Sequence, residues 1–225
     1  MTELDRPVYS VFRNREFQFE QRGAVGIMGK VAGKQDTKQA LLEVGMDMML
    51  ERGYTNTGIQ EVLTALSIPK GSFYHYFESK EAYAIEIIRH YDADFSVSLM
   101  RVLRNPEQSP IDRLRAFCAD SKTNFAAQHC RKGCLVGNLS QEMADQSESL
   151  RQELSRVMGK WCDIFAACID EGQKIGDITN SRTARELAEF FLSSWGGAMM
   201  WSKTLKSVGP IDIFIDLIFQ DVLLD

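Results

Sequence analysis

The sequence predicts an all-α protein, with an N-terminal helix-turn-helix domain of three helices followed by a larger helical domain. Apolar residues recur three and four positions apart along most of the chain, which is the spacing of one face of an α-helix. No segment alternates apolar and polar residues as a half-buried strand does, and no internal repeat is present. Between residues 57 and 77, two short helical patterns flank a two-residue turn, which favours a helix-turn-helix.

Length and composition narrow the class of protein. A chain of 225 residues can form one large or two small domains. It contains no apolar run long enough to span a bilayer and no signal-peptide pattern at its N-terminus, so we expect a cytoplasmic protein without membrane contact. Five cysteines without zinc-like paired spacing favour reduced thiols, with no metal and no cofactor.

Residues 1–33 show no sustained periodicity and are expected to form a disordered extension. Two alternatives stay open. The basic residues of this segment would suit an arm that enters the DNA minor groove, or Met28 is the true start of the protein.

The helix-turn-helix begins after a bracing helix that runs from about Thr37 and ends at Gly53. Thr57 is the expected N-cap of the first short helix, which reaches Leu66. The second short helix covers Ile68 to Phe77, with Pro69 in its first turn, where the missing amide costs nothing.

The second short helix has two different faces. Phe73 and Phe77 are four residues apart and share an apolar face, whereas Tyr74 and His75 point away from it. Ser79 is the expected N-cap of a long helix that ends before Asn105.

This region resembles the DNA-binding domain of the TetR family of transcriptional regulators. The residues that carry the resemblance are Gly53-Tyr54, Thr57, the run Pro69-Lys70-Gly71-Ser72-Phe73-Tyr74-His75-Tyr76-Phe77, and Ser79-Lys80-Glu81. Leu63, Ser67 and Pro69 stand where many members have alanine, glycine, and serine or threonine. These variants are similar to the branch that includes NemR-like and AcuR-like sensors.

The resemblance implies a DNA-binding domain over residues 34–82 and an effector-binding and dimerisation domain over residues 83–225. It implies a homodimer on a palindromic double-stranded DNA operator, with Tyr74 and His75 near base edges. The expected DNA-contacting residues are Thr57, Lys70, Gly71, Ser72, Tyr74, His75, Tyr76 and Lys80. The net charge of −5 opposes DNA binding, so the cations need to gather on one face.

The spacing of apolar residues in the C-terminal region predicts four further helices, over about 111–128, 147–171, 183–206 and 210–224. The last of them is too apolar for a surface helix, so it needs a partner. We expect the last two helices to pair with their symmetry mates as a four-helix interface.

Cys134 is the candidate sensing residue. Arg131 and Lys132 precede it, and a positive field from them would lower its pKa and activate the thiol. The segment 131–138 resembles the matching segment of the AcuR-like and NemR-like regulators, which implies a response to acrylate or to reactive electrophiles. The alternative is a small buried residue, as free cysteines often are. Cys130 would be a resolving thiol if both thiols faced one side.

A small-molecule effector would occupy a cavity lined by aromatic residues of the C-terminal domain. The candidates are Phe117, Phe165, Trp161, Trp195 and Trp201, with Phe117 and Trp195 favoured. Asn138, Gln141 and Glu142 would supply polar groups, and Arg131 or Asn138 would donate to a carboxylate. Each aromatic residue taken singly is also an ordinary core residue.

The sequence thus favours a ligand-responsive DNA-binding regulator, a repressor released by a small molecule such as an electrophile or an acrylate-like compound. One alternative is a thiol-based redox sensor that uses Cys134 with the same DNA-binding domain. The other is a helical enzyme or scaffold without a DNA role, although no catalytic motif is present. The effector, the target genes and the direction of control stay open.

Overall fold

The structure, a computed structural model, describes residues 34–224. The three interpretations of residues 1–33, a disordered tail, a minor-groove arm and a start at Met28, lie outside this range. Every regular element within residues 34–224 is helical, which confirms the predicted fold class. Across the same residues, none of the helices combines the length and apolar character that crossing a membrane requires.

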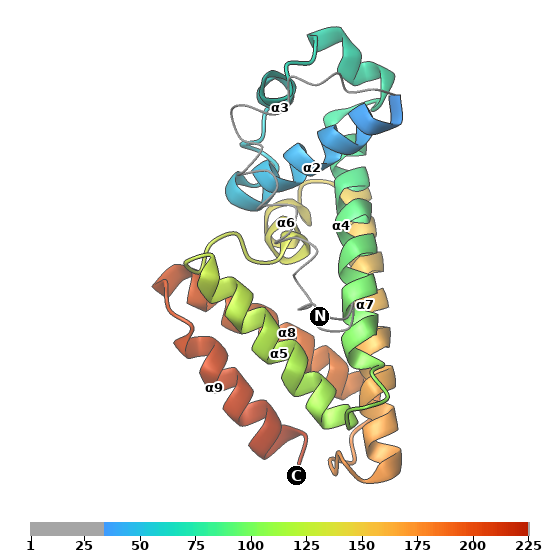
Figure 1. Cartoon of the computed structure of the whole chain (residues 1–225), viewed down its shortest axis with the longest axis vertical. Helices are drawn as coiled ribbons and strands as arrows, with labels where there is room; N and C mark the ends of the chain where they lie inside the picture. The colour runs from blue at the N-terminus through green and yellow to red at the C-terminus, as the bar shows by residue number, and fades with distance from the viewer. Residues whose placement is uncertain (1–33, 225) are drawn as a thin grey trace. The chain divides into compact units, whose positions relative to one another are not determined.

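The predicted helices occur in the predicted order, but the structure adds a further helix, α6 (Leu135–Met143), where the sequence predicted none (Figure 1). The elements are α2 (Lys34–Arg52), α3 (Ile59–Ala65), the 3₁₀ turn η2 (Lys70–His75), α4 (Lys80–Leu103), α5 (Pro110–Ala127), α6 (Leu135–Met143), α7 (Glu148–Ile175), α8 (Ala184–Leu205), α9 (Gly209–Leu217) and the π-helical turn η3 (Ile218–Val222). Three predicted helix ends are confirmed. Gly53 ends α2 with φ of 80°, Ser79 accepts a hydrogen bond from the amide of Ala82, and Thr183 forms a capping box with Glu186 at the start of α8.

The described chain forms two compact units. The first unit consists of residues 34–93 and 134–157, and the second unit of residues 94–133 and 158–224. Helices α4 and α7 contribute residues to both units. Helix α6 belongs to the first unit, together with the helix-turn-helix. The functional boundaries predicted at 34–82 and 83–225 stay a prediction.

The core of the first unit is built on three aromatic side chains. Phe73 and Phe77, predicted to share an apolar face, are almost fully buried, and both rings contact that of Tyr83 on α4. The hydroxyl of Tyr83 donates to the carbonyl of Leu41, and it lies where a Cβ atom on Gly45 would be. Turn η2 is therefore held by α4, and α4 in turn by α2.

Two local predictions within the helix-turn-helix are wrong. Gly58, not Thr57, is the N-cap of α3, because the hydroxyl of Thr57 instead donates to the carbonyl of Gly53 at 2.7 Å. The segment after Pro69 is a 3₁₀ turn, in which the amide of Ser72 bonds to the carbonyl of Pro69. Gly71 and Ser72 have low helix propensity and the turn is short, so tertiary packing sets its geometry.

Aromatic residues also form the core of the second unit. Phe117 of α5, Phe165 of α7, and Phe191 and Trp195 of α8 contact one another at ring-centroid distances of 5.0 to 6.3 Å. Phe214 of α9 closes the cluster against α8 at 5.2 Å from Phe191. Helix α9 thereby packs on α8 and α5 (Figure 1).

Helix α7 extends further than predicted. The loop expected from Gly172 begins only at Gly176, which has φ of 78° and ends the helix. Gly172 stays helical because the chain needs a residue without a side chain there. A Cβ atom on Gly172 would lie 2.7 Å from Ile178 and 3.2 Å from Pro110. Glycine at this position marks a close approach instead of a helix end.

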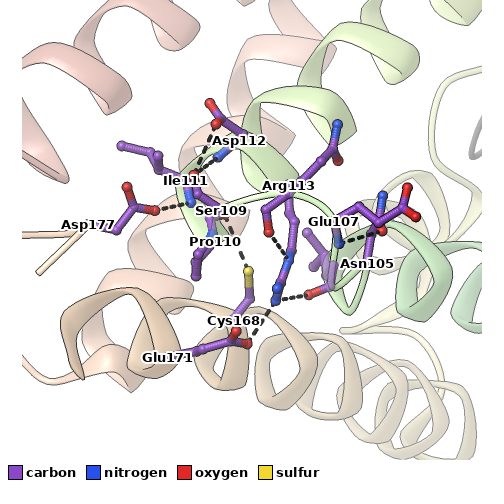
Figure 2. A network of polar contacts seen from close by, with 12 residues as sticks. Asn105, Glu107, Ser109, Pro110, Ile111, Asp112, Arg113, Cys168, Glu171 and Asp177 are labelled. Carbon is purple, nitrogen blue, oxygen red and sulfur yellow. Dashed lines mark hydrogen bonds and ion pairs between the residues drawn. The ribbon is translucent and has the colours of Figure 1, made fainter. Parts of the chain in front are cut away.

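A buried arginine of α5 links the connection between α4 and α5 to α7 by hydrogen bonds (Figure 2). Arg113 is only 5% exposed, and it donates to the carbonyls of Gln108 and Leu103 and to the carboxylate of Glu171. Close by, the carboxylate of Asp177 accepts from the amide of Ile111 at 2.8 Å. The guanidinium thus satisfies carbonyl groups that the end of α4 and the loop leave free.

We expect Arg113→Ala to lower the free energy of unfolding by about 2 kcal/mol, because the buried carbonyl of Leu103 and the partly buried carbonyl of Gln108 lose their donor. The matched control is Arg115→Ala, which removes an exposed arginine of the same helix that pairs with Asp112. Urea unfolding followed by circular dichroism at one protein concentration measures both. Equal effects of the two substitutions would contradict the role given to Arg113.

Candidate nucleic-acid interface

Turn η2 presents a polar and aromatic surface to solvent. Tyr74 is 63% exposed, Lys70, Gly71 and His75 are also exposed, and Ser72 and Tyr76 are half-buried. The buried Phe73 fixes Tyr74 from behind, with the two ring centroids 5.4 Å apart in an edge-to-face arrangement. A large exposed aromatic residue held by a buried one is pre-positioned for contact with a partner.

The start of η2 is open to close approach. Apart from Gly71 and its two chain neighbours, no atom of residues 34–224 lies within 4 Å of the position that a Cβ atom on Gly71 would take. Lys70 is exposed, and within residues 34–224 no carboxylate pairs with it. This free cation beside an open backbone suits an anionic partner such as a phosphate.

Ser67 sets the direction in which η2 leaves α3. It has φ of 55°, in the left-handed region that glycine adopts most easily. The amide of the next residue, Ile68, donates back to the carbonyl of Leu63 at 2.9 Å. This is the position where many family members have glycine. The positive φ of Ser67 gives the physical reason for glycine there.

Two predicted phosphate contacts have internal partners. Thr57 is 1% exposed, so its side chain supports the loop between α2 and α3 instead of facing solvent. The ammonium group of Lys80 donates to the carbonyl of Thr55 at 3.2 Å and lies 4.5 Å above the ring of Tyr54. Partial burial lowers the pKa of Lys80, and the charge of Glu142 opposes that shift. DNA contact by either residue stays a prediction.

Sequence reasoning missed the role of Glu142. It placed this residue among the polar groups of an effector cavity, whereas its carboxylate accepts hydrogen bonds from the amides of Tyr54 and Thr55, both at 2.8 Å. Glu142 follows Tyr54 by 88 positions, so no local pattern in the sequence reveals the contact.

Ion pairs neutralise much of the charge of the first unit. Lys38 pairs with Glu86, and Arg52 with Glu61. Arg89 pairs with Glu153, whose carboxylate also accepts from Arg156. Among residues 34–224 no acid pairs with Lys70 on the exposed surface of η2, so the local charge there is more positive than the composition of the chain suggests.

Cys134 is the N-cap of α6, and its Sγ accepts a hydrogen bond from the amide of Gly137 at 3.5 Å. Burial raises the pKa of the Cys134 thiol, and this effect exceeds the opposing hydrogen bonds from the amides of Gly137 and Val136 and the hydroxyl of Tyr91. The predicted lowering of the pKa by Arg131 and Lys132 is therefore wrong. The residue as a whole is nevertheless half-buried.

The other predicted effector residues do not form one group. Phe117 and Trp195 contact each other within the aromatic core of the second unit, at 5.6 Å between centroids. Trp161 packs on Phe95 at 4.5 Å. Asn138 lies on α6 in the first unit, and Arg131 is exposed in the loop before it. Their roles in effector binding stay predictions.

The remaining cysteines lie in the core, and the expectation that they are reduced thiols stays a prediction. Cys118, Cys162 and Cys168 are buried and free, as is Cys130. Within residues 34–224, no three histidine, cysteine or acidic side chains gather to hold a metal ion.

Two family models match the chain. The model described as bacterial regulatory proteins, tetR family, matches residues 41–87, which include α3 and η2. The model described as tetracyclin repressor-like, C-terminal domain, matches residues 110–218.

Individual relatives agree with the family models. The HTH-type transcriptional repressor DhaR of Mycobacterium sp. (strain GP1) is 34% identical over 83% of this chain and 92% of its own. The transcriptional regulator AcuR of Cereibacter sphaeroides is 33% identical over 83% of this chain and 86% of its own. The crystal structure of reduced E. coli NemR superimposes with a TM-score of 0.77 at 29% identity, covering 81% of this chain and 95% of NemR. The chain therefore belongs to the TetR family of bacterial transcriptional regulators, in the branch that includes AcuR and NemR.

Proposed function

We propose that the protein is a homodimeric repressor that reads a palindromic operator with η2 and leaves it when a small molecule binds. The observation that carries this proposal is the exposed surface of η2, on which Tyr74, His75 and Lys70 face solvent while Phe73 anchors the turn. Family membership supports the repressor assignment, since DhaR and NemR are both named transcriptional repressors.

In this proposal the residues of η2, with Tyr76 and Lys80 just after it, have distinct roles. Tyr74 and His75 contact base edges in the major groove, where aromatic and imidazole groups offer apolar and hydrogen-bonding contacts. Lys70 and Tyr76 contact phosphates, and Lys80 contributes through its remaining donors. Gly71 and Ser72 let the backbone approach the DNA closely, because the space around Gly71 is open.

We expect Lys70→Ala to weaken binding to operator and to unrelated DNA alike, and to reduce the salt slope of binding by about 1, because one phosphate contact is lost. Tyr74→Ala is expected to weaken operator binding alone, by about 1–3 kcal/mol. Fluorescence anisotropy at several salt concentrations measures both. The charge control is Lys174→Ala on α7, an exposed lysine paired with Asp170. If both η2 variants bound operator as tightly as this control, η2 would not be the reading element.

The dimer interface is proposed to involve the exposed faces of α8 and α9. Large apolar side chains remain exposed there, namely Phe190, Met200, Trp201, Leu205, Ile213 and Leu217. Gly197 lies between them on α8 with no neighbour within 4 Å of a Cβ position, which would let a second helix approach closely. A row of exposed apolar residues along two packed helices is typical of an interface between subunits.

Trp201→Glu is expected to convert the dimer to a monomer, because it places a charge within the proposed interface. The matched control is Ile175→Glu at the end of α7, where the side chain is 65% exposed compared with 59% for Trp201. Light scattering coupled to size-exclusion chromatography gives the mass of each variant. A dimer that persists in Trp201→Glu, or dissociates in both variants, would contradict the assignment.

The proposed effector is an electrophile or an acrylate-like compound, as the resemblance to the AcuR-like and NemR-like branch implies. To act, it needs a higher affinity for the conformation that does not bind the operator. A covalent route is supported by one observation, namely that Cys134 caps α6 and accepts hydrogen bonds that favour its thiolate. In that route the sulfur bonds to the β-carbon of the alkene and the thiol proton moves to the α-carbon. Reversible binding beside Phe117 and Trp195, which contact each other in the second unit, is the other route.

Cys134 is expected to react slowly with iodoacetamide at neutral pH, more slowly than a free thiol such as glutathione, because burial raises its pKa. Below that raised pKa the thiolate fraction, and hence the rate, should increase roughly tenfold per pH unit. Tyr91→Phe should slow the reaction further, because it removes a hydroxyl that lowers the pKa. Peptide mass spectrometry follows the adduct, with Cys134→Ser as the blank. A rate at pH 7 above that of glutathione would contradict the raised pKa.

A further inference from the structure

Glu142, in the last turn of α6, holds the loop between α2 and α3 with both oxygens of its carboxylate. Oε2 accepts from the amide of Tyr54 and Oε1 from the amide of Thr55, each at 2.8 Å. All three residues belong to the first unit. Two consecutive amides on one carboxylate form a bidentate, charge-assisted contact, which fixes orientation as well as distance.

The loop is shaped to receive this carboxylate. Gly53 has φ of 80°, and a Cβ atom there would lie 2.4 Å from Oε2 of Glu142. Glycine is therefore required both for the backbone conformation and for the space that the carboxylate occupies. The contact depends on a close approach that any other residue would prevent.

The carboxylate is ionised in this setting. Burial alone would raise the pKa of Glu142, but the amide and hydroxyl of Thr55, the amide of Tyr54 and the charge of Lys80 together lower it. Lys80 also bonds to the carbonyl of Thr55 and covers the ring of Tyr54. The loop is thus held between an anion from α6 and a cation from α4.

The held loop sets the start of α3. Gly58, the N-cap of α3, provides no side-chain hydrogen bond. The position of this helix start is instead set by the preceding loop. There Thr57 donates to the carbonyl of Gly53, and Glu142 accepts from the amides of Tyr54 and Thr55. Helix α3 packs against η2, so a displaced loop would change the angle of the DNA-reading surface.

We propose that Glu142 is a positioning residue for operator binding, which acts from α6 by fixing the loop 53–57 and, through α3, the orientation of η2. This inference rests on the proposed function. It assigns to Glu142 a role in operator affinity, in addition to any contribution to stability.

The test compares Glu142→Gln with Asp145→Asn. Asp145 is an exposed acid three residues further along the chain, so both variants lose one negative charge and share the general electrostatic effect on DNA binding. Fluorescence anisotropy measures the Kd for operator and for an unrelated duplex. Hydrogen–deuterium exchange of the peptide that contains Tyr54 and Thr55 reports on the amide bonds directly, and the thermal midpoint reports on stability.

Relative to Asp145→Asn, Glu142→Gln is expected to bind operator about tenfold more weakly, bind the unrelated duplex equally well and exchange these amides faster. Equal operator affinity in the two variants would overturn the inference. So would a parallel loss of affinity for both duplexes with a lowered midpoint, because this would give Glu142 a structural role only. If Glu142→Gln does not fold, Glu142→Asp, which is shorter by one methylene and keeps the charge, replaces it and is compared with the wild-type protein.

The same data separate this inference from the proposed function. A wild-type protein that binds no duplex from its own upstream region better than an unrelated one would refute the function itself. Unchanged exchange of the Tyr54 and Thr55 amides in Glu142→Gln would show that Glu142 does not hold the loop 53–57, whatever the protein binds.

Discussion

The first unit depends on the burial of Phe73 and Phe77 against Tyr83. A 3₁₀ turn of six residues has no stability of its own, because too few hydrogen bonds offset the entropy of ordering it. The two buried rings supply that stability and fix the side chains between them. Tyr74 and His75 lie between the two buried rings and are exposed, so the anchor and the exposed surface are two sides of one turn.

Helix α6 places two chemically different residues at its opposite ends. Cys134 caps its N-terminus, and Glu142 lies in its last turn against the helix-turn-helix. At about 1.5 Å per residue, eight residues separate them by about 12 Å along a single rigid element. A compound that displaces the cap would therefore act on the same helix that holds the loop 53–57.

Charge in this protein is arranged locally. A chain with a net charge of −5 is a poor candidate for DNA binding by composition alone. In the first unit, however, ion pairs neutralise several cations and acids, while Lys70 of η2 has no acidic partner in the described part of the chain. The negative charge of Glu142 is likewise matched by two amides and Lys80, which keeps it from opposing the DNA. Position, more than total charge, determines where an anion would bind.

The sequence by itself determined the helical fold, most helix boundaries and the two faces of η2, because apolar periodicity and capping residues act over three or four positions. It also identified the exposed residues Lys70, Tyr74 and His75. Tertiary structure decided the rest: the inward turn of Thr57, the 3₁₀ form of η2, the helical Gly172, the raised pKa of Cys134 and the contact of Glu142 with Tyr54 and Thr55. Burial and close approach between segments far apart in sequence produce each of these, and no local pattern encodes them.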